Sequence, residues 1–253
     1  MKSVAKRMFG VLILAFATLF IGWHGLKYYF MHVNRISSQV RNNVLMKIQA
    51  QHSQFLSYNE IPKIYREAVI ATEDRSFSRN KGIDLKGTLR AVKVDISREQ
   101  PLQGGSTITQ QLIHNTLLVN TSKSLMWKLI ESVYAIGLYD TMSKQETFSF
   151  YANVIYFGQG ANGLYQAAEI YFGRPPSKLN AGELTMLAGI PNAPSDYDPY
   201  SNIALARERQ HIVIQCLVDS GVINESQAQQ ILSEPINLKD SRPSTNKLKL
   251  ALV

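Results

Sequence analysis

The hydrophobic and polar positions divide the chain into an apolar N-terminal run and a longer stretch with helical periodicity. Residues 8–26 contain no Lys, Arg, Asp or Glu, and their centre, residues 11–21, is strongly apolar. A helix of this length spans about 28 Å, close to the thickness of a bilayer core. Lys2, Lys6 and Arg7 precede the run. They predict an N-terminus in the cytoplasm and a chain that continues outside it.

A cleaved signal peptide is the alternative interpretation of this run. The small-x-small sequence at 15–17 that cleavage would need lies inside the apolar run, which is too early, so we expect an uncleaved anchor. The division that we expect is a cytoplasmic N-terminus (1–7), a transmembrane anchor (8–30), a helical linker (31–58), a main domain (59–237) and a C-terminal tail (238–253).

Helical periodicity dominates the main domain. Pro62 suits the first turn of a helix that presents spaced aliphatic residues on one side and ends at Glu73 and Asp74. Ser143 with Glu146 predicts a capping box at the start of another helix. Further helices are expected over residues 106–119, 122–140, 205–220 and 225–232. Because few segments alternate as strands do, the predicted fold class is predominantly α.

Composition and charge narrow the class of protein. The chain has 253 residues, of which 45% are hydrophobic, enough for one domain and an anchor. Its net charge of +8 comes from scattered basic residues without an aromatic–basic repeat, so nucleic acid is not an expected partner. Cations also suit anionic lipid heads and a lipid pyrophosphate. Cys216 is the single cysteine, so no internal disulfide forms, and no Cys/His cluster predicts structural zinc.

The basic residues of segment 84–103 alternate with aliphatic ones. This pattern is typical of an amphipathic segment that faces a membrane, and equally of an ordinary surface helix. The sequence leaves both interpretations open.

Residues 104–112, Gly-Gly-Ser-Thr-Ile-Thr-Gln-Gln-Leu, contain two glycines, three hydroxyls and two adjacent amides. Glycine allows a backbone to approach a ligand closely. Ser106 or Thr107 can cap a helix whose free N–H groups favour an anion. The motif therefore predicts a polar loop that leads into a helix and points at an anionic or hydroxyl-rich ligand. An ordinary capped helix is the alternative.

Glu73 and Asp74 form a second polar motif. Adjacent carboxylates repel each other, so one of them tends to keep its proton near neutral pH if the pair is partly buried. Such a group suits general acid or base catalysis. The alternative is a solvated acidic pair at the end of a helix.

Taken together, these motifs resemble the peptidoglycan glycosyltransferases of family 51, the transglycosylase domains of class A penicillin-binding proteins. The resemblance covers roughly residues 60–210, in order. It also includes Lys128-Leu-Ile-Glu131, Tyr151-Ala-Asn153-Val-Ile-Tyr-Phe-Gly158 and Glu183-Leu-Thr-Met-Leu-Ala-Gly189. It implies a lysozyme-like helical domain in two lobes. The implied reaction polymerises lipid II into β-1,4-linked glycan and releases undecaprenyl pyrophosphate.

The resemblance also assigns roles to residues. Glu73 matches the general base, and Glu131 matches a second carboxylate that assists the leaving group directly or through a divalent cation, Mg or Mn. The resemblance does not require a metal ion and assigns no metal ligands. Lys128 and Glu131 share a helix face, for which a surface ion pair is the alternative. The substrate-binding residues that it implies are Asp74, Phe77, Arg90, Ser106, Thr107, Gln110, Gln111, His114, Asn115, Lys123 and Lys128.

Several positions depart from the family pattern. His114 stands where lysine is usual, Asn80 where histidine is usual, and Trp127 and Lys123 where arginine is usual. Two fixed cations beside the pyrophosphate are thus lost or weakened, since histidine is charged only when protonated. Because the carboxylates are retained, we expect an active but attenuated polymerase. The alternatives are a non-catalytic paralogue that serves as a scaffold and a lysozyme-like hydrolase.

The expected partners follow from the same resemblance. They are lipid II, the growing glycan strand, the membrane and other proteins of cell-wall synthesis. The Lys-Thr-Gly motif of a transpeptidase is absent from the sequence, so a monofunctional enzyme is expected. Its expected location is the bacterial cytoplasmic (inner) membrane, single-pass, with the catalytic domain on the outer side.

Overall fold

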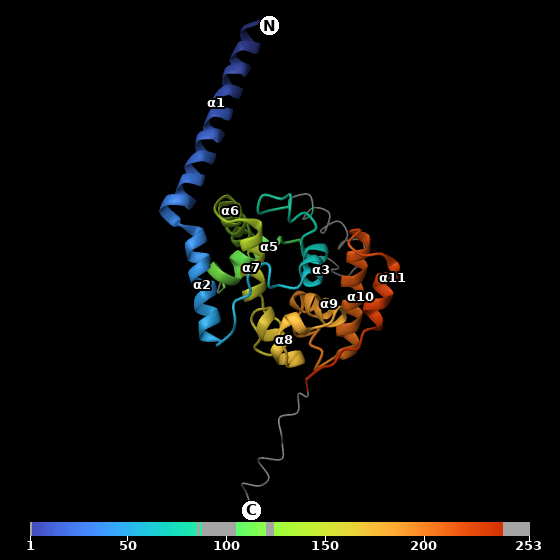
Figure 1. Ribbon diagram of the computed structural model, residues 1–253. Helices are drawn as coiled ribbons and strands as arrows, with labels where there is room; N and C mark the ends of the chain where they lie inside the picture. The colour runs from blue at the N-terminus through green and yellow to red at the C-terminus, as the bar shows by residue number, and fades with distance from the viewer. Residues whose placement is uncertain (1, 85–86, 88–104, 120–123, 240–253) are drawn as a thin grey trace, which may run out of the picture.

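The computed structural model describes residues 2–84, 87, 105–119 and 124–239 (Figure 1). Within these residues the fold is predominantly α, as the sequence predicts, and the β structure amounts to one isolated bridge between Tyr156 and Asn162. Most of segment 84–103 lies outside the described residues, so its two interpretations both stand.

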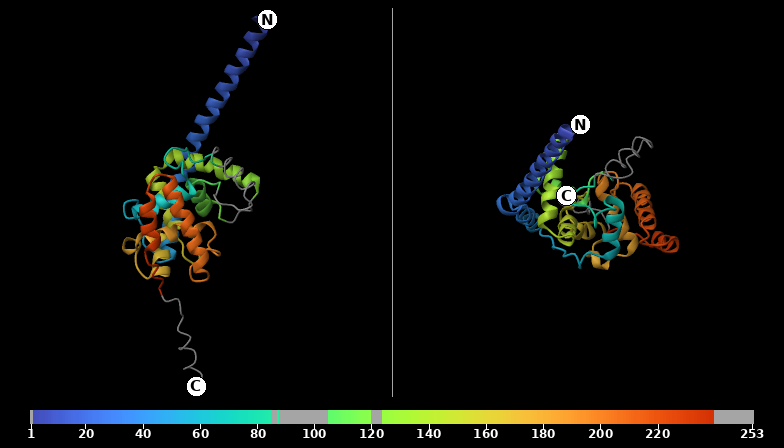
Figure 2. Two further views of the ribbon diagram at one scale, coloured as in Figure 1. Left: turned by 90° about the vertical axis from the view of Figure 1, so that its right-hand side faces the viewer. Right: turned by 90° about the horizontal axis from the view of Figure 1, so that it is seen from above.

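The N-terminal helix α1 (Lys2–Tyr28) extends away from the rest of the molecule (Figures 1 and 2). Its apolar side chains from Met8 to Ile21 are largely exposed. In the described part of the chain, one helical segment, which starts at Met8, is long and apolar enough to cross a membrane. By length and composition it suits an anchor or a signal sequence.

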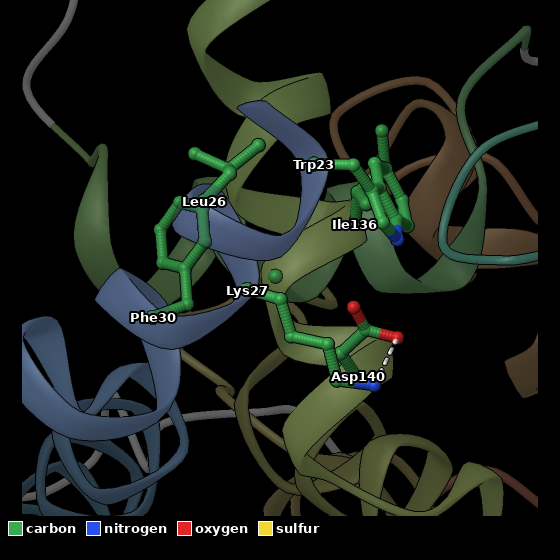
Figure 3. Close-up of a pocket in the computed structure, with 7 residues that line it drawn as sticks. Trp23, Leu26, Lys27, Phe30, Ile136 and Asp140 are labelled. Atoms are coloured by element: carbon green, nitrogen blue, oxygen red, sulfur yellow. Dashed lines mark ion pairs between the residues drawn. The ribbon is translucent and has the colours of Figure 1, made fainter. Parts of the chain in front are cut away.

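The end of this helix packs against α6 (Leu125–Thr141). Phe30 lies in the π-helix η1 (Tyr29–Asn34) and is buried over Gly137, where a Cβ atom would come within 2.5 Å of its ring. Lys27 Nζ lies 3.8 Å from Asp140 Oδ1, and Trp23 lines the same junction (Figure 3). A glycine at position 137 is therefore what allows the two elements to meet.

Helix α2 (Ile36–Ala50) follows within the segment expected as a linker, residues 31–58. The segment is helical up to Ala50, whereas residues 51–58 are not helical, and its spaced aliphatic residues Val40 and Val44 are fully buried. They pack in the core with α5 (Ile108–Leu117), α6 and α7 (Lys144–Val154). The helix is thus an integral part of the domain.

The remaining helices pack in two groups (Figures 1 and 2). In one group, α3 (Lys63–Glu73) contacts α9 (Ala181–Gly189) and α10 (Ile203–Asp219), with α11 (Glu225–Ser233) against both of the latter. In the other group, α5 contacts α2, α6 and α7. Helix α8 (Leu164–Phe172) joins the groups through α7 and α9, and the 3-10 turns η2 (Pro176–Lys178) and η3 (Ile190–Asn192) flank α9.

The helix starts follow the local sequence. Ser143 Oγ accepts a hydrogen bond of 3.2 Å from the backbone N–H of Glu146 and donates one of 3.1 Å to its carboxylate. Asn202 and Asn224 cap α10 and α11 in the same way, and Gly221 supplies the left-handed turn between them with a φ of 69°. These capping side chains therefore set the first residues of α7, α10 and α11.

Candidate active site

Glu73 is the last residue of α3, and its side chain is 6% exposed. Its Oε2 accepts a hydrogen bond of 3.0 Å from Gln111 Nε2, and its Oε1 lies 3.5 Å from a guanidinium nitrogen of Arg209. Burial raises the pKa of Glu73, Arg209 and Gln111 partly oppose that shift, and the neighbouring Asp74 adds to it. The result is a buried carboxylate that binds a proton more readily than a solvated one.

Asp74 is buried beside it and serves a different purpose. Its Oδ2 accepts a hydrogen bond of 3.1 Å from the backbone N–H of Ile108, at the start of α5. Asn80 Nδ2 donates to both of its oxygens at 2.8 and 3.0 Å. Burial raises the pKa of Asp74, and these hydrogen bonds oppose the shift. The carboxylate therefore fixes the end of α3 to the start of α5.

Asn80 also connects this carboxylate to a cation. Its Oδ1 accepts a hydrogen bond of 2.8 Å from Lys144 Nζ, which lies 4.6 Å from the centre of the Phe77 ring. Burial lowers the pKa of Lys144 to about 8, although Asp74 draws it upward. The departure at position 80 thus leaves Asp74 fully bonded, with its positive neighbour supplied by Lys144. The sequence analysis did not assign that role to Lys144.

The start of α5 is held by side chains that the sequence analysis expected at the substrate. Thr107 and Gln110 form a capping box and are both buried. Thr107 Oγ1 donates a hydrogen bond of 2.6 Å to the carbonyl of Gly82, and Gln110 Nε2 donates one of 3.1 Å to Ser132 Oγ. Their polar groups are engaged within the protein, so a substrate contact by them stays a prediction.

Glu131 forms the second charged cluster, on α6. Lys128 Nζ donates a hydrogen bond to its Oε1, and donates another of 2.6 Å to Ser106 Oγ. His114 Nδ1 lies 3.6 Å from its Oε2. Glu131 is 10% exposed, whereas the side chains of Lys128 and His114 are more than 40% exposed. The pair is therefore a buried carboxylate with its cations on the solvent side, which differs from a surface ion pair.

Helix α5 brings the two carboxylates to one side of the molecule. Gln111 contacts Glu73, and His114 contacts Glu131. Residues three apart on a helix share a face, with Cβ atoms about 5–6 Å from each other. The structure therefore assembles the two acidic residues predicted from sequence along a single face of α5.

Other predicted residues have packing roles or lie outside the described part. Asn115 Nδ2 donates to the Gln111 carbonyl at 2.8 Å, Phe77 is buried, and Trp127 packs half-buried against the core. Arg90 and Lys123 lie outside the described residues.

Arg209 was missed by the sequence analysis. It lies on α10 with its side chain 2% exposed, among the buried residues Ala206, Val213 and Leu217. These residues are spaced as the apolar face of a helix. A charged residue on such a face indicates a buried ion pair, and the sequence could have been interpreted in this way. A buried arginine requires a partner, and Glu73 is the acidic one.

The donor set around Glu131 does not suit a divalent cation held by the protein alone. The carboxylate already faces the ammonium of Lys128 and the imidazole of His114. Among the described residues, no three His, Cys, Asp or Glu side chains gather closely enough to bind a metal ion. A cation at this site would need ligands from the substrate.

Comparisons with known proteins identify the family of the chain. The family model described as Transglycosylase matches residues 41–218, well over half of the chain. The chain therefore belongs to the transglycosylase family.

Two relatives illustrate the match. Penicillin-binding protein 1A of Aquifex aeolicus (strain VF5) is 35% identical over 185 residues, which are 73% of this chain and 25% of that protein. Penicillin-binding protein 1F of Bacillus subtilis (strain 168) is 40% identical over 173 residues, 68% of this chain and 24% of that one. This chain thus spans about a quarter of the length of these curated relatives.

A solved structure also aligns with the chain. It is penicillin-binding protein 1A from Haemophilus influenzae, with a TM-score of 0.44 and 19% identity over 79% of this chain and 21% of that one. The family assignment rests on the sequence matches.

Proposed function

We propose that the protein polymerises lipid II into β-1,4-linked glycan strands and releases undecaprenyl pyrophosphate. In this reaction the 4-hydroxyl of an acceptor sugar attacks C1 of the donor sugar, and the bond from C1 to the pyrophosphate breaks. The anomeric centre is inverted. Glu73 accepts the proton of the attacking hydroxyl.

The observation that carries this proposal is the environment of Glu73. A general base works best when its pKa lies near the working pH. Burial raises the pKa of Glu73 towards that range, while Arg209 and Gln111 keep the ionised form accessible. Gln111 also fixes the orientation of the carboxylate, which a proton transfer needs.

The cluster around Glu131 suits the departing pyrophosphate. Lys128 and Ser106 present an ammonium and a hydroxyl on the solvent side, and His114 adds a charge when it is protonated. Positive groups of this kind stabilise the charge that develops on a leaving group. Glu131 would hold Lys128 and His114 in place. We draw no step through a metal ion, since the Glu131 carboxylate is already paired with the ammonium of Lys128.

Partners and location extend the proposal. The protein would bind lipid II and the growing strand, act beside other cell-wall synthesis proteins, and sit in the bacterial cytoplasmic membrane through α1 with its domain outside. Family membership and the apolar α1 support this placement.

A polymerisation assay tests the proposed reaction. The purified full chain is incubated with labelled lipid II in detergent, and separately with preformed glycan. Polymer is the expected product. Unchanged lipid II would favour the scaffold, and cleavage of the preformed glycan would favour a hydrolase.

Two variants test the base itself. Glu73→Gln keeps the size of the side chain but accepts no proton, so we expect a loss of about 10²–10⁴-fold in rate. Glu67→Gln is the matched control, because Glu67 lies on the same helix and pairs with the exposed Lys63 at 3.6 Å. Near-normal polymerisation by folded Glu73→Gln would refute the assignment of the base.

A further inference from the structure

Arg209 comes to Glu73 from a helix that the sequence motifs of the site do not include. Helix α10 packs against both α3 and α9, and this packing brings residues 73 and 209 together. Both side chains are almost completely buried, at 6% and 2% exposure, and the nearest charged atoms are 3.5 Å apart. A buried ion pair is sensitive to the loss of either partner, because the remaining charge has no solvent to stabilise it.

Three contacts hold the guanidinium group in this position. Its Nε donates a hydrogen bond of 3.4 Å to the carbonyl of Gly189, and its central carbon lies 5.6 Å from the centre of the Tyr197 ring. A Cβ atom at position 189 would lie 2.8 Å from Arg209 Cγ, so the glycine leaves room for the arginine stem. The third contact is the ion pair with Glu73 itself. The contacts with Gly189 and Tyr197 therefore hold the guanidinium group of Arg209 beside the Glu73 carboxylate.

We propose that Arg209 is a positioning residue that holds the Glu73 carboxylate ionised and oriented for the proton transfer. This inference rests on the proposed function, since it concerns the base of that reaction. It places α9 and α10 in the support of the active site, although neither carries one of the two carboxylates.

Three other titratable groups lie near Glu73, and Asp74 is the one that raises its pKa. Asp74 follows it in the chain, Tyr65 lies on α3 and Tyr151 lies on α7, and both phenols are fully buried. Arg209 is the cationic group among the described residues that opposes burial at this carboxylate. Removing it therefore leaves Glu73 with one neutral hydrogen-bond donor, Gln111.

The pH profile of kcat/KM for lipid II polymerisation tests this role. Glu73 must be ionised to act, so the rate falls on the acid side as the base becomes protonated. In Arg209→Met the acid limb should move to higher pH by about 1–3 units, the effect of an opposite charge at such a distance. The loss of rate should therefore be larger at pH 6 than at pH 9. Arg209→Lys retains the charge and should keep the limb near its wild-type position.

Arg207→Met is the matched control, because Arg207 lies on the same helix and its guanidinium contacts Gln210 at 3.0 Å. It should leave the acid limb unchanged. An equal loss at every pH in Arg209→Met, with the limb unmoved, would overturn the proposal and leave Arg209 a packing residue.

Folding gives a second readout. If Arg209→Met does not fold, the double variant Glu73→Gln/Arg209→Met decides the matter. It should regain a cooperative melting transition, since no buried charge then lacks a partner. A double variant that stays unfolded would show that Arg209 acts only through its packing with Gly189 and Tyr197. Failure of the proposed function is distinguishable, because Glu73→Gln alone would then remain active.

Discussion

At the scale of single residues, Glu73 is ionised at a cost to the folded state. Its folded pKa is raised, so the folded protein binds this proton more tightly than the unfolded chain does. The stability from this group is complete below about pH 4.3, the ordinary value for glutamate, and is lost as pH rises through the folded pKa. Residues poised for catalysis often oppose stability in this manner.

A first prediction follows for Glu73→Gln. The amide does not titrate, so the stability of the variant relative to the wild type should rise from pH 4 to pH 7, by up to about 1.4 kcal/mol for each unit by which the pKa is raised. The unpaired Arg209 lowers the stability of the variant at every pH and does not change this slope. Urea unfolding at pH 4, 5.5 and 7 measures the difference. Asp74 titrates in both proteins and cancels to first order. A difference that stays constant with pH would contradict the raised pKa.

His114 leads to a second prediction. Its Nδ1 lies 3.6 Å from Glu131, which also pairs with Lys128. A permanent cation at position 114 would therefore strengthen the binding of the pyrophosphate by this cluster. His114→Lys should raise polymerisation by up to about ten- to hundredfold, the equivalent of one charge-assisted contact.

Rates of the wild type and His114→Lys, measured with lipid II from pH 6 to pH 8.5, check this prediction. His211→Lys is a suitable control, since His211 lies on the exposed side of α10. Equal activity of the two proteins at every pH would show that position 114 does not contact the phosphates.

At the scale of elements, the segment that follows α3 depends on a glycine. Gly82 has a φ of 90°, and a Cβ atom there would lie 2.3 Å from the carbonyl oxygen of Ala135 on α6. The same glycine accepts the hydrogen bond of Thr107 from the start of α5. Gly82, the start of α5 and α6 therefore meet at a point without room for a side chain.

A third prediction compares two glycines that share a left-handed backbone. Gly160 has a φ of 75°, but a Cβ atom there would meet no neighbour within 4 Å. Gly82→Ala should therefore cost about 1–3 kcal/mol more in the free energy of unfolding than Gly160→Ala. It should also slow polymerisation, because α6 carries Glu131. Urea unfolding and the lipid II assay check both effects. An equal loss in the free energy of unfolding for the two variants would contradict a clash between a Cβ atom at position 82 and the Ala135 carbonyl.

Local sequence predicted most of these elements, because caps and periodicity act over a few residues. Ser143 and Asn224 begin helices where the pattern predicts them, and Glu73 ends its helix as expected. The pairing of Glu73 with Arg209 depends on how α10 packs on α3, which no local pattern encodes. The hydrogen bond from Lys144 on α7 to Asn80 depends on packing in the same way.

At the scale of the whole molecule, the helical domain and α1 have different environments. The domain buries its own core, whereas α1 exposes the apolar side chains that a bilayer would cover. Figure 2 shows α1 extending away from the other helices.

A fourth prediction concerns this arrangement. A reporter enzyme fused to the C-terminus should be active only outside the cytoplasm, because Lys2, Lys6 and Arg7 precede the apolar run of α1. The full-length protein should remain in the membrane fraction after a carbonate wash. Charge substitutions at Leu14 and Phe16 should release it, and they serve as the control. A shortened, soluble form of the wild type would instead identify α1 as a signal sequence.

The contact of Phe30 with Gly137 has a geometric consequence for a membrane-anchored enzyme. Glu131 lies on the same helix, six residues before Gly137, which corresponds to a rise of about 9 Å along α6. If α1 spans the bilayer, its outer end and the Glu131 cluster are joined by one rigid element. The height of the reaction above the lipid head groups is then constant, and it matches the short reach of a sugar attached to its lipid through pyrophosphate.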